Sequence, residues 1–258
     1  MTAQDRQDAI LDLLQARERV DANTLEQHFQ VSIQTIRSDL RDLSEAGLLQ
    51  RTHGGARRII SASNKDYSER RKLNAHRKER IGALAASLIP DNCSITLNIG
   101  TTTETVARAL GGHRDLVILS NNINIINTFM GAKTKELILV GGTIRQSDGA
   151  IVGEDAVEFI SRYKVDFAVI GASALDIDGS ILDYDAREVS VARAILRNAR
   201  TRLLVCDTTK FERTAPVRIC DVSELDYVIT DTPPPKSFAD AALAADTQIL
   251  TTEEADET

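Results

Sequence analysis

Residues 31–40 read VSIQTIRSDL and residues 51–58 read RTHGGARR, and these two stretches decide the fold of the N-terminal part. Ser32 is a good N-cap, so the first stretch predicts a helix that runs to about Ala46, with Gly47 just past its end. The apolar residues of this helix recur at helical spacing and predict its buried face: Ile33, Ile36, Leu40 and Leu43.

The opposite face of this helix is polar and carries Gln34, Arg37, Ser38 and Arg41, spaced i, i+3, i+4 and i+7. Amide and guanidinium groups pair with adenine and guanine edges in the major groove of DNA, and the N-terminal residues of a recognition helix reach those edges. Taken alone, the same face would also suit an ordinary helix exposed to water. The segment before it therefore decides between the two interpretations.

A short helix is predicted directly before the recognition helix. Asn23 and Glu26 have the spacing of a capping box, and Leu25 and Phe29 share one inward face. Val31 then ends a tight turn. A short helix, a tight turn and a second helix with a polar outer face predict a helix-turn-helix, so the DNA-binding interpretation is favoured.

The second stretch predicts a hairpin around Gly54-Gly55, with Arg51, Arg57 and Arg58 on its two arms. A basic hairpin directly after a recognition helix is a wing, placed to meet DNA phosphates. His53 is expected to pack or to contact phosphate, because no second metal ligand stands at a suitable spacing. The candidate DNA-contacting residues are Ser32, Gln34, Thr35, Arg37, Ser38, Arg41, Arg51, His53, Gly54, Gly55 and Arg57.

The charge of the chain is unevenly distributed. The 258 residues have a net charge of −7, yet residues 51–80 hold ten Lys or Arg against three Asp or Glu. A local basic segment in an acidic protein suits a polyanion such as double-stranded DNA, and a solvated charged linker is the alternative.

Length and composition predict two soluble domains of unequal size. The expected boundaries are 1–58 for a winged helix-turn-helix, 59–77 for a basic linker that includes the flexible stretch 61–64, and 78–258 for a larger domain. No apolar run approaches the length of a membrane span, and the N-terminus lacks the pattern of a signal peptide. Three scattered cysteines (Cys93, Cys206 and Cys220) are expected to be core residues in a reducing cytoplasm.

Short apolar runs alternate with amphipathic stretches through the larger domain, which predicts a mainly parallel, Rossmann-like α/β sheet with helices on its faces. The first helix is expected from about Lys78 to Pro90. Further helical stretches are 104–110 and 189–197. The predicted strands are 95–99, 116–119, 137–140, 167–170, 203–206 and 227–229.

Polar residues follow three of these strands, where ligands bind in open α/β sheets. Gly100 and three threonines precede a helix that Thr101 and Glu104 could cap, which favours an anion such as phosphate. Each polar stretch alone is more typical of a cap or a turn, but the three together predict a site. The candidate residues are Asn98, Gly100, Thr101, Thr102, Thr103, Ser120, Asn121, Asn122, Gly141, Gly142, Asp183, Glu188 and Lys210.

Two alternatives bear on this predicted site. Glu188 and Lys210 could instead form a surface ion pair, while Lys210 in the site would neutralise a phosphate. Residues 176–179 read DIDG and hint at a calcium loop, but position twelve would be Arg187, so a turn is predicted and no metal is expected.

The recognition-helix and wing stretches together resemble the N-terminal signature of DeoR-type bacterial regulators. Residues 98–102 (NIGTT), 120–122 (SNN), 148–153 (DGAIVG) and 207–211 (DTTKF) are similar to the sensor domain of that family. The resemblance implies a sensor related to sugar-phosphate isomerases and CoA transferases, a homo-oligomer, and an effector that is a phosphorylated sugar or related metabolite. Glycerol 3-phosphate is the first candidate.

Three positions depart from the family pattern. Ser38 stands where a second basic residue is usual, which affects one DNA contact. Asn98 replaces a usual Asp, and Ala192 replaces a helix Lys, with Arg193 adjacent. Losing the carboxylate would favour phosphate binding, whereas losing the lysine would weaken it.

The sequence therefore predicts a cytoplasmic repressor, without catalytic residues or a cofactor, that a phosphorylated metabolite releases from operator DNA. An activator of the same family is an alternative, because the sign depends on where the operator lies. A sugar-phosphate isomerase with an added DNA-binding module is a weaker alternative, for which Glu188 and Lys210 would have to transfer protons.

Overall fold

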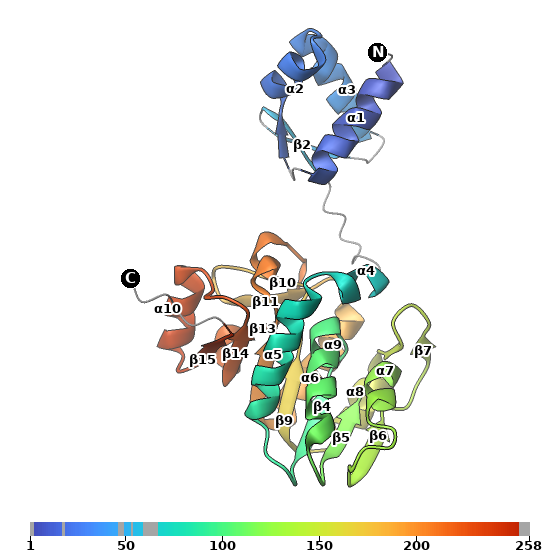
Figure 1. Ribbon diagram of the computed structural model, residues 1–258, viewed down its shortest axis with the longest axis vertical. Helices are drawn as coiled ribbons and strands as arrows, with labels where there is room; N and C mark the ends of the chain where they lie inside the picture. Colours follow the sequence, from blue (N-terminus) through green and yellow to red (C-terminus); the bar gives the residue numbers. More distant parts are fainter. Residues whose placement is uncertain (1–2, 17–18, 46–48, 53, 59–66, 253–258) are drawn as a thin grey trace. The chain divides into compact units, whose positions relative to one another are not determined.

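A computed structural model of the chain describes residues 3–16, 19–45, 49–52, 54–58 and 67–252. The chain divides into two compact units, Met1–Ser61 and Ala62–Thr258 (Figure 1). Within the described ranges, no helix is both long enough and apolar enough to cross a membrane.

The first unit is a winged helix-turn-helix. Its elements are α1 (Ala3–Ala16), β1 (Arg19–Asp21), α2 (Ala22–Phe29), α3 (Ile33–Glu45), β2 (Leu49–Thr52) and β3 (Gly55–Arg58). The three strands form an antiparallel sheet in the order β1-β3-β2. Ile10, Leu25, Ile36, Leu40 and Leu43 are buried together in its core. The predicted recognition helix and wing hairpin are therefore confirmed.

The N-cap of α3 agrees with the prediction, whereas the N-cap of α2 does not. The Ser32 hydroxyl accepts a hydrogen bond from the Thr35 backbone N–H at 3.2 Å, as its predicted N-cap role requires. The capping-box prediction for Asn23 is wrong, because Asp21 is the N-cap of α2 and accepts from the Asn23 N–H at 2.8 Å. The carboxylate of Asp21 lies at the end of the unpredicted strand β1, where it reaches the first turn of α2.

A buried ion pair fixes α3 against α1. The Arg6 Nε donates to Asp39 Oδ2 at 2.6 Å, and a second guanidinium nitrogen donates to Oδ1 at 3.1 Å. Both side chains are buried. A bidentate pair in this position orients α3 so that its opposite face is presented to solvent.

Gly55 is a position where the wing tolerates no side chain. A Cβ there would lie 2.0 Å from the Val20 carbonyl oxygen and 2.9 Å from the Asp21 Cα, because β1 and β3 pair closely. We expect Gly55→Ala to lower the free energy of unfolding of the first unit by about 2 kcal/mol, since backbone atoms must move apart. Calorimetric unfolding of the full chain would measure this.

Gly54 provides the matched control for that prediction. A Cβ at Gly54 would meet only Asp21 Oδ2, at 3.6 Å, which is an ordinary contact. Gly54→Ala should change stability by less than about 0.5 kcal/mol. Equal losses in the two variants would contradict the strand pairing described here.

The second unit is an α/β domain around one parallel sheet of seven strands, in the order β15-β14-β12-β9-β4-β5-β6. Its strands are β4 (Ser94–Leu97), β5 (Val117–Ser120), β6 (Glu136–Leu139), β9 (Val165–Ile170), β12 (Ala199–Val205), β14 (Tyr227–Thr230) and β15 (Gln248–Thr251).

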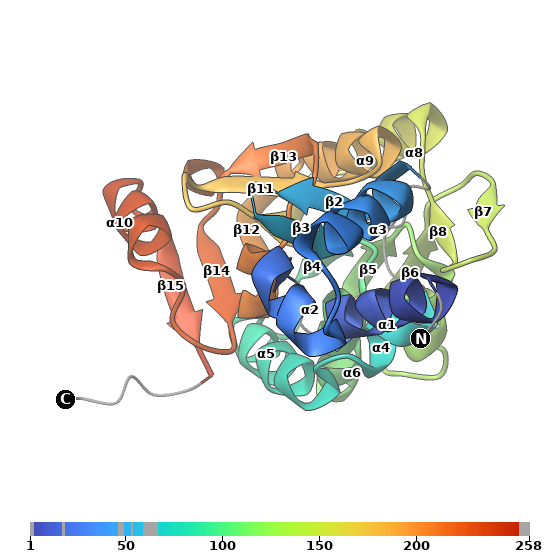
Figure 2. The same cartoon turned by 90° about the horizontal axis from the view of Figure 1, so that it is seen from above.

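Helices cover both faces of this sheet. Their bounds are α4 (Tyr67–Lys72), α5 (Ala75–Ser87), α6 (Thr101–Ala109), α7 (Ile123–Thr128), α8 (Glu154–Ile160), α9 (Ala186–Arg197) and α10 (Lys236–Ala244), with 3-10 turns η1 (Leu110–Gly112), η2 (Thr208–Glu212) and η3 (Val222–Glu224). Val169 packs with α5, α6 and α7 on one face, while its neighbours Ala168 and Ile170 pack with α8, α9 and α10 on the other. Figure 2 shows α5 and α6 on the side of the sheet opposite α8 and α9.

The predicted Rossmann-like domain and its six strands are confirmed, but several elements were not predicted. Besides helices over 154–160 and 236–244, these are the edge strand β15, the hairpin of β7 (Ile144–Arg145) and β8 (Ala150–Ile151), and a small antiparallel sheet of β10 (Ala174–Leu175), β11 (Ser180–Asp183) and β13 (Val217–Asp221). Residues 176–179 form the predicted turn between β10 and β11, where the Asp176 N–H donates to the Ser180 carbonyl at 3.0 Å.

The segment 67–77, for which the sequence predicted linker, is helical and belongs to the second unit as α4 and the start of α5. Arg77 pairs with Asp231 at 3.0 Å, and Asn74 donates to Asp207 at 3.2 Å, so this segment packs against the ends of the sheet. The predicted flexible stretch 61–64 lies outside the described residues, as do Ala46, Gly47, His53 and the side chains of Arg57 and Arg58.

Candidate functional site

The outer face of α3 carries the predicted DNA-reading side chains. Gln34, Arg37 and Arg41 are exposed, while Ile36 and Leu40 on the other face are buried. Ser38 accepts a hydrogen bond from Arg41 at 3.1 Å, so Ser38 holds the neighbouring guanidinium on this face. Ser32 and Thr35 share a hydroxyl contact at 2.9 Å at the start of α3.

A groove runs between α3 and the wing. Arg37 of α3 and Arg51 of β2 line it together with Thr52, Gly54 and Gly55. Asn23, at the start of α2, also lines it and was not predicted as a site residue. The Gly54 carbonyl accepts from the Ala22 N–H at 2.8 Å, which ties the tip of the wing to α2. Helix and wing thus present two arginines and several polar groups to one groove.

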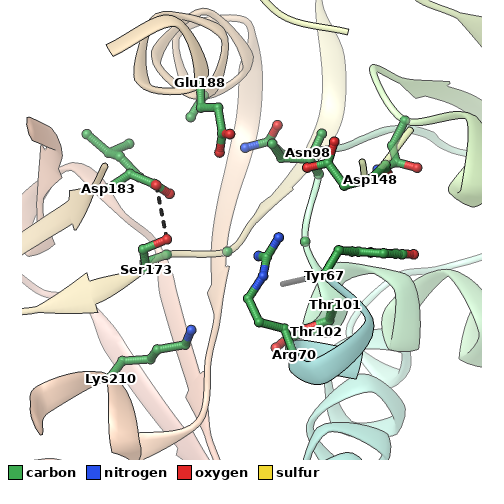
Figure 3. A pocket seen from close by; sticks show the side chains of 17 residues that line it. Tyr67, Arg70, Asn98, Thr101, Thr102, Asp148, Ser173, Asp183, Glu188 and Lys210 are labelled. Carbon is green, nitrogen blue, oxygen red and sulfur yellow. Dashed lines mark hydrogen bonds between the residues drawn. The ribbon is translucent and has the colours of Figure 1, made fainter. Parts of the chain in front are cut away.

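A polar cavity lies at the carboxyl ends of the central strands of the second unit (Figure 3). Its walls come from the ends of β4, β9 and β11, the starts of α6, α7 and α9, and from α4 and η2. The residues that line it are Tyr67, Arg70, Asn98, Ile99, Gly100, Thr101, Thr102, Asn122, Asp148, Gly171, Ala172, Ser173, Asp183, Glu188, Ala192, Lys210 and Ile219.

The N-terminus of α6 forms one wall of the cavity. Gly100 precedes the helix with φ 137°, a conformation that L side chains rarely adopt, and no side chain caps the first turn. The sequence predicted caps from Thr101 and Glu104, and this is wrong: Thr101 accepts from Lys78, and Glu104 accepts from Tyr67. The first backbone N–H groups of α6 therefore point at the cavity with the positive end of the helix dipole.

The cations of the cavity gather at the same end as the α6 N-terminus. Figure 3 shows Lys210 extending into the cavity from one side, and Arg70 rising from α4 near Thr101 and Thr102 with its guanidinium directed toward Asn98. Burial, with Arg213 close by, lowers the pKa of Lys210 to about 8. A buried ammonium that is poorly stabilised in the free protein would gain from an anion, so this end of the cavity suits phosphate.

The opposite end of the cavity is acidic. Glu188, Asp183 and Asp148 lie there beside Asn98 (Figure 3). Burial and the charge of Asp183 raise the pKa of Glu188 to about 6, although Arg145 opposes this shift. Burial likewise raises the pKa of Asp183, whose carboxylate accepts from the Ser173 hydroxyl at 3.0 Å. Carboxylates and hydroxyl groups suit the hydroxyls of a polyol.

The structure brings eight of the thirteen predicted ligand residues to the cavity: Asn98, Gly100, Thr101, Thr102, Asn122, Asp183, Glu188 and Lys210. Five others are not in its lining. The Thr103 hydroxyl donates to the Gly100 carbonyl at 2.6 Å, Ser120 donates to Leu97, and Asn121 donates to Ile151, so these three side chains support the backbone. Gly141 and Gly142 lie near Phe159 and Ile151.

The predicted alternative of an ion pair between Glu188 and Lys210 is wrong. Glu188 pairs instead with Arg145 at 2.6 Å, and Arg145 also reaches Asp148 at 2.6 Å. Arg145 was not predicted because it lies on the small hairpin β7–β8, which only the tertiary fold brings to α9.

Sequence reasoning also missed Tyr67, Arg70, Asp148 and Ser173 as cavity residues. Arg70 lies in the basic segment that was interpreted as linker, so its charge was noticed but its place was not. Among the described residues, no cluster of three or more His, Cys, Asp or Glu side chains is placed to hold a metal ion.

Two family models cover most of the chain. Residues 6–62 match the DeoR-like helix-turn-helix domain, and residues 73–232 match the DeoR C terminal sensor domain. The chain belongs to the DeoR family. The predicted family resemblance and the two-domain fold class are confirmed by these matches and by the architecture described above.

Several relatives of the chain are named as repressors. The glycerol-3-phosphate regulon repressor of Escherichia coli K12 is 42% identical over 237 residues, which cover 92% of this chain and 94% of that protein. The HTH-type transcriptional repressor CsqR of the same organism is 34% identical over 92% of this chain and 91% of its own length. Ribose 5-phosphate isomerase A of Methanocaldococcus jannaschii aligns with 53% of this chain and 54% of that chain, at 16% identity and a TM-score of 0.39.

Proposed function

We propose that this DeoR-family protein is a transcriptional repressor that binds operator DNA through α3 and the wing and leaves it when a small phosphorylated metabolite fills the cavity. The observation that supports release by a phosphorylated metabolite is the polarity of the cavity. The α6 N-terminus, Lys210 and Arg70 form a cationic end, while Asp183 and Glu188 form an acidic end. Glycerol 3-phosphate is our first candidate, and another sugar phosphate is the second.

A phosphorylated polyol matches both ends of the cavity. Its phosphate would accept from the free N–H groups of α6 and pair with Lys210, while its hydroxyls would donate to Asp183 and Glu188. The Asn98 Oδ1 is buried and finds no hydrogen-bond partner within the described chain. A ligand hydroxyl would satisfy it, and a neutral amide at this position adds no further negative charge beside Glu188.

The relatives' names support glycerol metabolism as the regulated process and repression as the sign of regulation. We propose a cytoplasmic homo-oligomer, because paired recognition helices bind paired half-sites. Activation is the alternative, and its test is transcription from the bound promoter with and without the protein. Lower output with the protein would support repression, and higher output would support activation.

We propose no enzymatic role. Two observations support this: relatives of the chain are named as repressors, and Glu188 pairs with Arg145 at 2.6 Å in place of Lys210, the predicted partner for proton transfer. Incubation with ribose 5-phosphate and other sugar phosphates, followed by analysis of the products, tests this directly. Isomerised product above the background of protein-free buffer would contradict it.

The first test of the proposed function is a binding titration. The purified protein is titrated against DNA from upstream of its own gene, with and without glycerol 3-phosphate and a set of sugar phosphates. We expect one of these compounds to weaken DNA binding at least tenfold. If the protein binds DNA and none of these compounds alters the binding, the proposed release by a phosphorylated metabolite is contradicted, while the proposed DNA binding stands.

Binding of the phosphorylated ligand should depend on pH in a defined way. Lys210, with a pKa of about 8 in the free protein, must be protonated to pair with phosphate, and binding then raises its pKa. Affinity is therefore highest between about pH 6 and pH 8 and falls by up to about tenfold per unit as the pH rises above that range. On the acid side, affinity falls below about pH 6, where a phosphate monoester loses its second charge.

Calorimetric titration with glycerol 3-phosphate between pH 5.5 and 9.5 measures this profile. Lys210→Arg supplies the control, because a guanidinium stays charged across the range and should flatten the alkaline side. An alkaline decline of equal steepness in both proteins would assign the titration to another group.

A further inference from the structure

Helix α4 places Arg70 in the wall of the cavity. This helix is the first described element after residues 59–66, which connect the second unit to the DNA-binding unit. Figure 3 shows the Arg70 guanidinium pointing into the cavity toward Asn98, with Lys210 across the cavity, whereas the Tyr67 ring points away from it. A helix next to the interdomain connection thus contributes a cation to the ligand site.

The charge of Arg70 acts on groups on both sides of the cavity. Burial raises the pKa of Asp183, and the cations of Lys210 and Arg70 oppose that rise. Burial lowers the pKa of Lys78, and Arg70 lowers it further, against the effect of Asp207. Arg70 thus lies within electrostatic range of Asp183 and Lys78, and it lines the same cavity as Thr101 and Thr102 of α6.

Buried polar contacts hold α4 on α5 and α6. The Lys78 Nζ donates to the Arg70 carbonyl at 2.6 Å and to the Thr101 hydroxyl at 3.0 Å, so it joins α4 to the first residue of α6. The Tyr67 hydroxyl donates to Glu104 at 2.5 Å and accepts from Asn124 at 3.0 Å. Lys78 and Glu104 are each only 4% exposed, so these bonds are shielded from water.

Helix α4 is so short that it depends on its contacts with α5 and α6 to stay folded. It has six residues, none of them buried, and helices far shorter than about 12 residues are unstable alone in water. The same first turn of α6 that offers N–H groups to an anion also bonds, through Lys78, to the backbone of α4. An anion bound there would lie next to the Lys78–Thr101 contact, which links α6 to the backbone of α4.

We propose that Arg70 is a ligand-binding residue supplied by α4, and that the phosphate of the ligand holds α4 against α6. Occupancy of the cavity then controls the docking of the segment that leads to the DNA-binding unit. This inference rests on the proposed phosphorylated ligand. It adds the residue and the helix through which the ligand would act on DNA binding.

Two titrations test the binding role of Arg70. The full-length wild type, Arg70→Ala and Arg70→Lys are titrated calorimetrically with glycerol 3-phosphate and, separately, with inorganic phosphate. We expect Arg70→Ala to weaken binding of glycerol 3-phosphate at least tenfold and Arg70→Lys to recover part of the loss. Glu69→Ala is the matched control, because Glu69 is exposed on the same helix and outside the cavity lining, and it should bind like the wild type.

Hydrogen exchange of the backbone amides of residues 68–73 tests the docking of α4. In the wild type, saturating ligand should slow their exchange at least tenfold, because the bound phosphate holds the helix in place. In Arg70→Ala, the ligand added to saturation should slow it less than threefold. A role for Arg70 in stability alone would speed exchange in the free protein and leave the slowing by ligand intact.

The outcomes separate this inference from the proposed function. If glycerol 3-phosphate, inorganic phosphate and the set of sugar phosphates all fail to bind the wild type, the proposed ligand class fails and the inference falls with it. If they bind the wild type and Arg70→Ala equally, or if ligand leaves the exchange of 68–73 unchanged, only the role of Arg70 and α4 is overturned.

Discussion

Arg37→Ala should reduce specific binding of operator DNA at least 100-fold while leaving the fold intact. Arg37 is exposed at the outer face of α3 and lines the groove between α3 and the wing. A bidentate arginine–guanine contact contributes about 1–3 kcal/mol to discrimination, and a regulator that binds two half-sites loses the contact twice. Electrophoretic or fluorescence titrations with specific and scrambled DNA would measure the loss.

Arg37→Lys separates base reading from phosphate contact in the same position. Lysine keeps the charge but lacks the planar fork, so specific affinity should fall while binding to scrambled DNA and its dependence on salt stay close to wild type. A melting temperature equal to that of the wild type would show that α3 keeps its place. Unchanged operator affinity in Arg37→Ala would contradict the assignment of α3 as the recognition helix.

Lys210→Met should leave the repressor on its DNA at ligand concentrations that release the wild type. Lys210 supplies the ammonium group at the cationic end of the cavity, and burial lowers the pKa of this group to about 8. Removing one partner of a buried charge pair costs about 2–5 kcal/mol, so affinity for glycerol 3-phosphate should fall about 100-fold. Methionine retains the length and the apolar stem of the side chain, which limits the effect on packing.

The matched control for this variant is Lys236→Met. Lys236 is exposed at the start of α10 and is absent from the cavity lining, so its loss removes one positive charge without touching the site. Ligand titration and DNA release should match the wild type. If Lys210→Met also released DNA at the wild-type ligand concentration, the cationic end of the cavity would not be the phosphate site.

The first unit, the winged helix-turn-helix, illustrates what local sequence patterns can predict. The Ser32 cap, the buried residues Ile36, Leu40 and Leu43, and the hairpin around Gly54-Gly55 depend on contacts within a few residues and were confirmed. Ile33, predicted in the same buried face, is only partly buried. Strand β1 was missed because it has three residues and pairs with β3, more than thirty residues away. The N-cap of α2 was predicted at Asn23, two residues too late, because Asp21 and Asn23 both suit an N-cap. Only the register of β1 decides between them.

In the second unit, too, features set by neighbouring residues were predicted, and features set by residues far apart in the sequence were not. Six strands of the parallel sheet were predicted because strands buried on both faces have continuous apolar runs. The sequence by itself also determined the family and placed polar residues after β4 and β5. The tertiary structure alone decided which of these residues face the cavity, because Ser120, Asn121 and Thr103 turn inward to bond backbone carbonyls. It also decided that Arg145 reaches Glu188, 43 residues away, and that Tyr67 reaches Glu104 of α6, 37 residues away, and it placed Arg70 in the cavity wall. Contacts across such distances leave no periodic pattern in the chain.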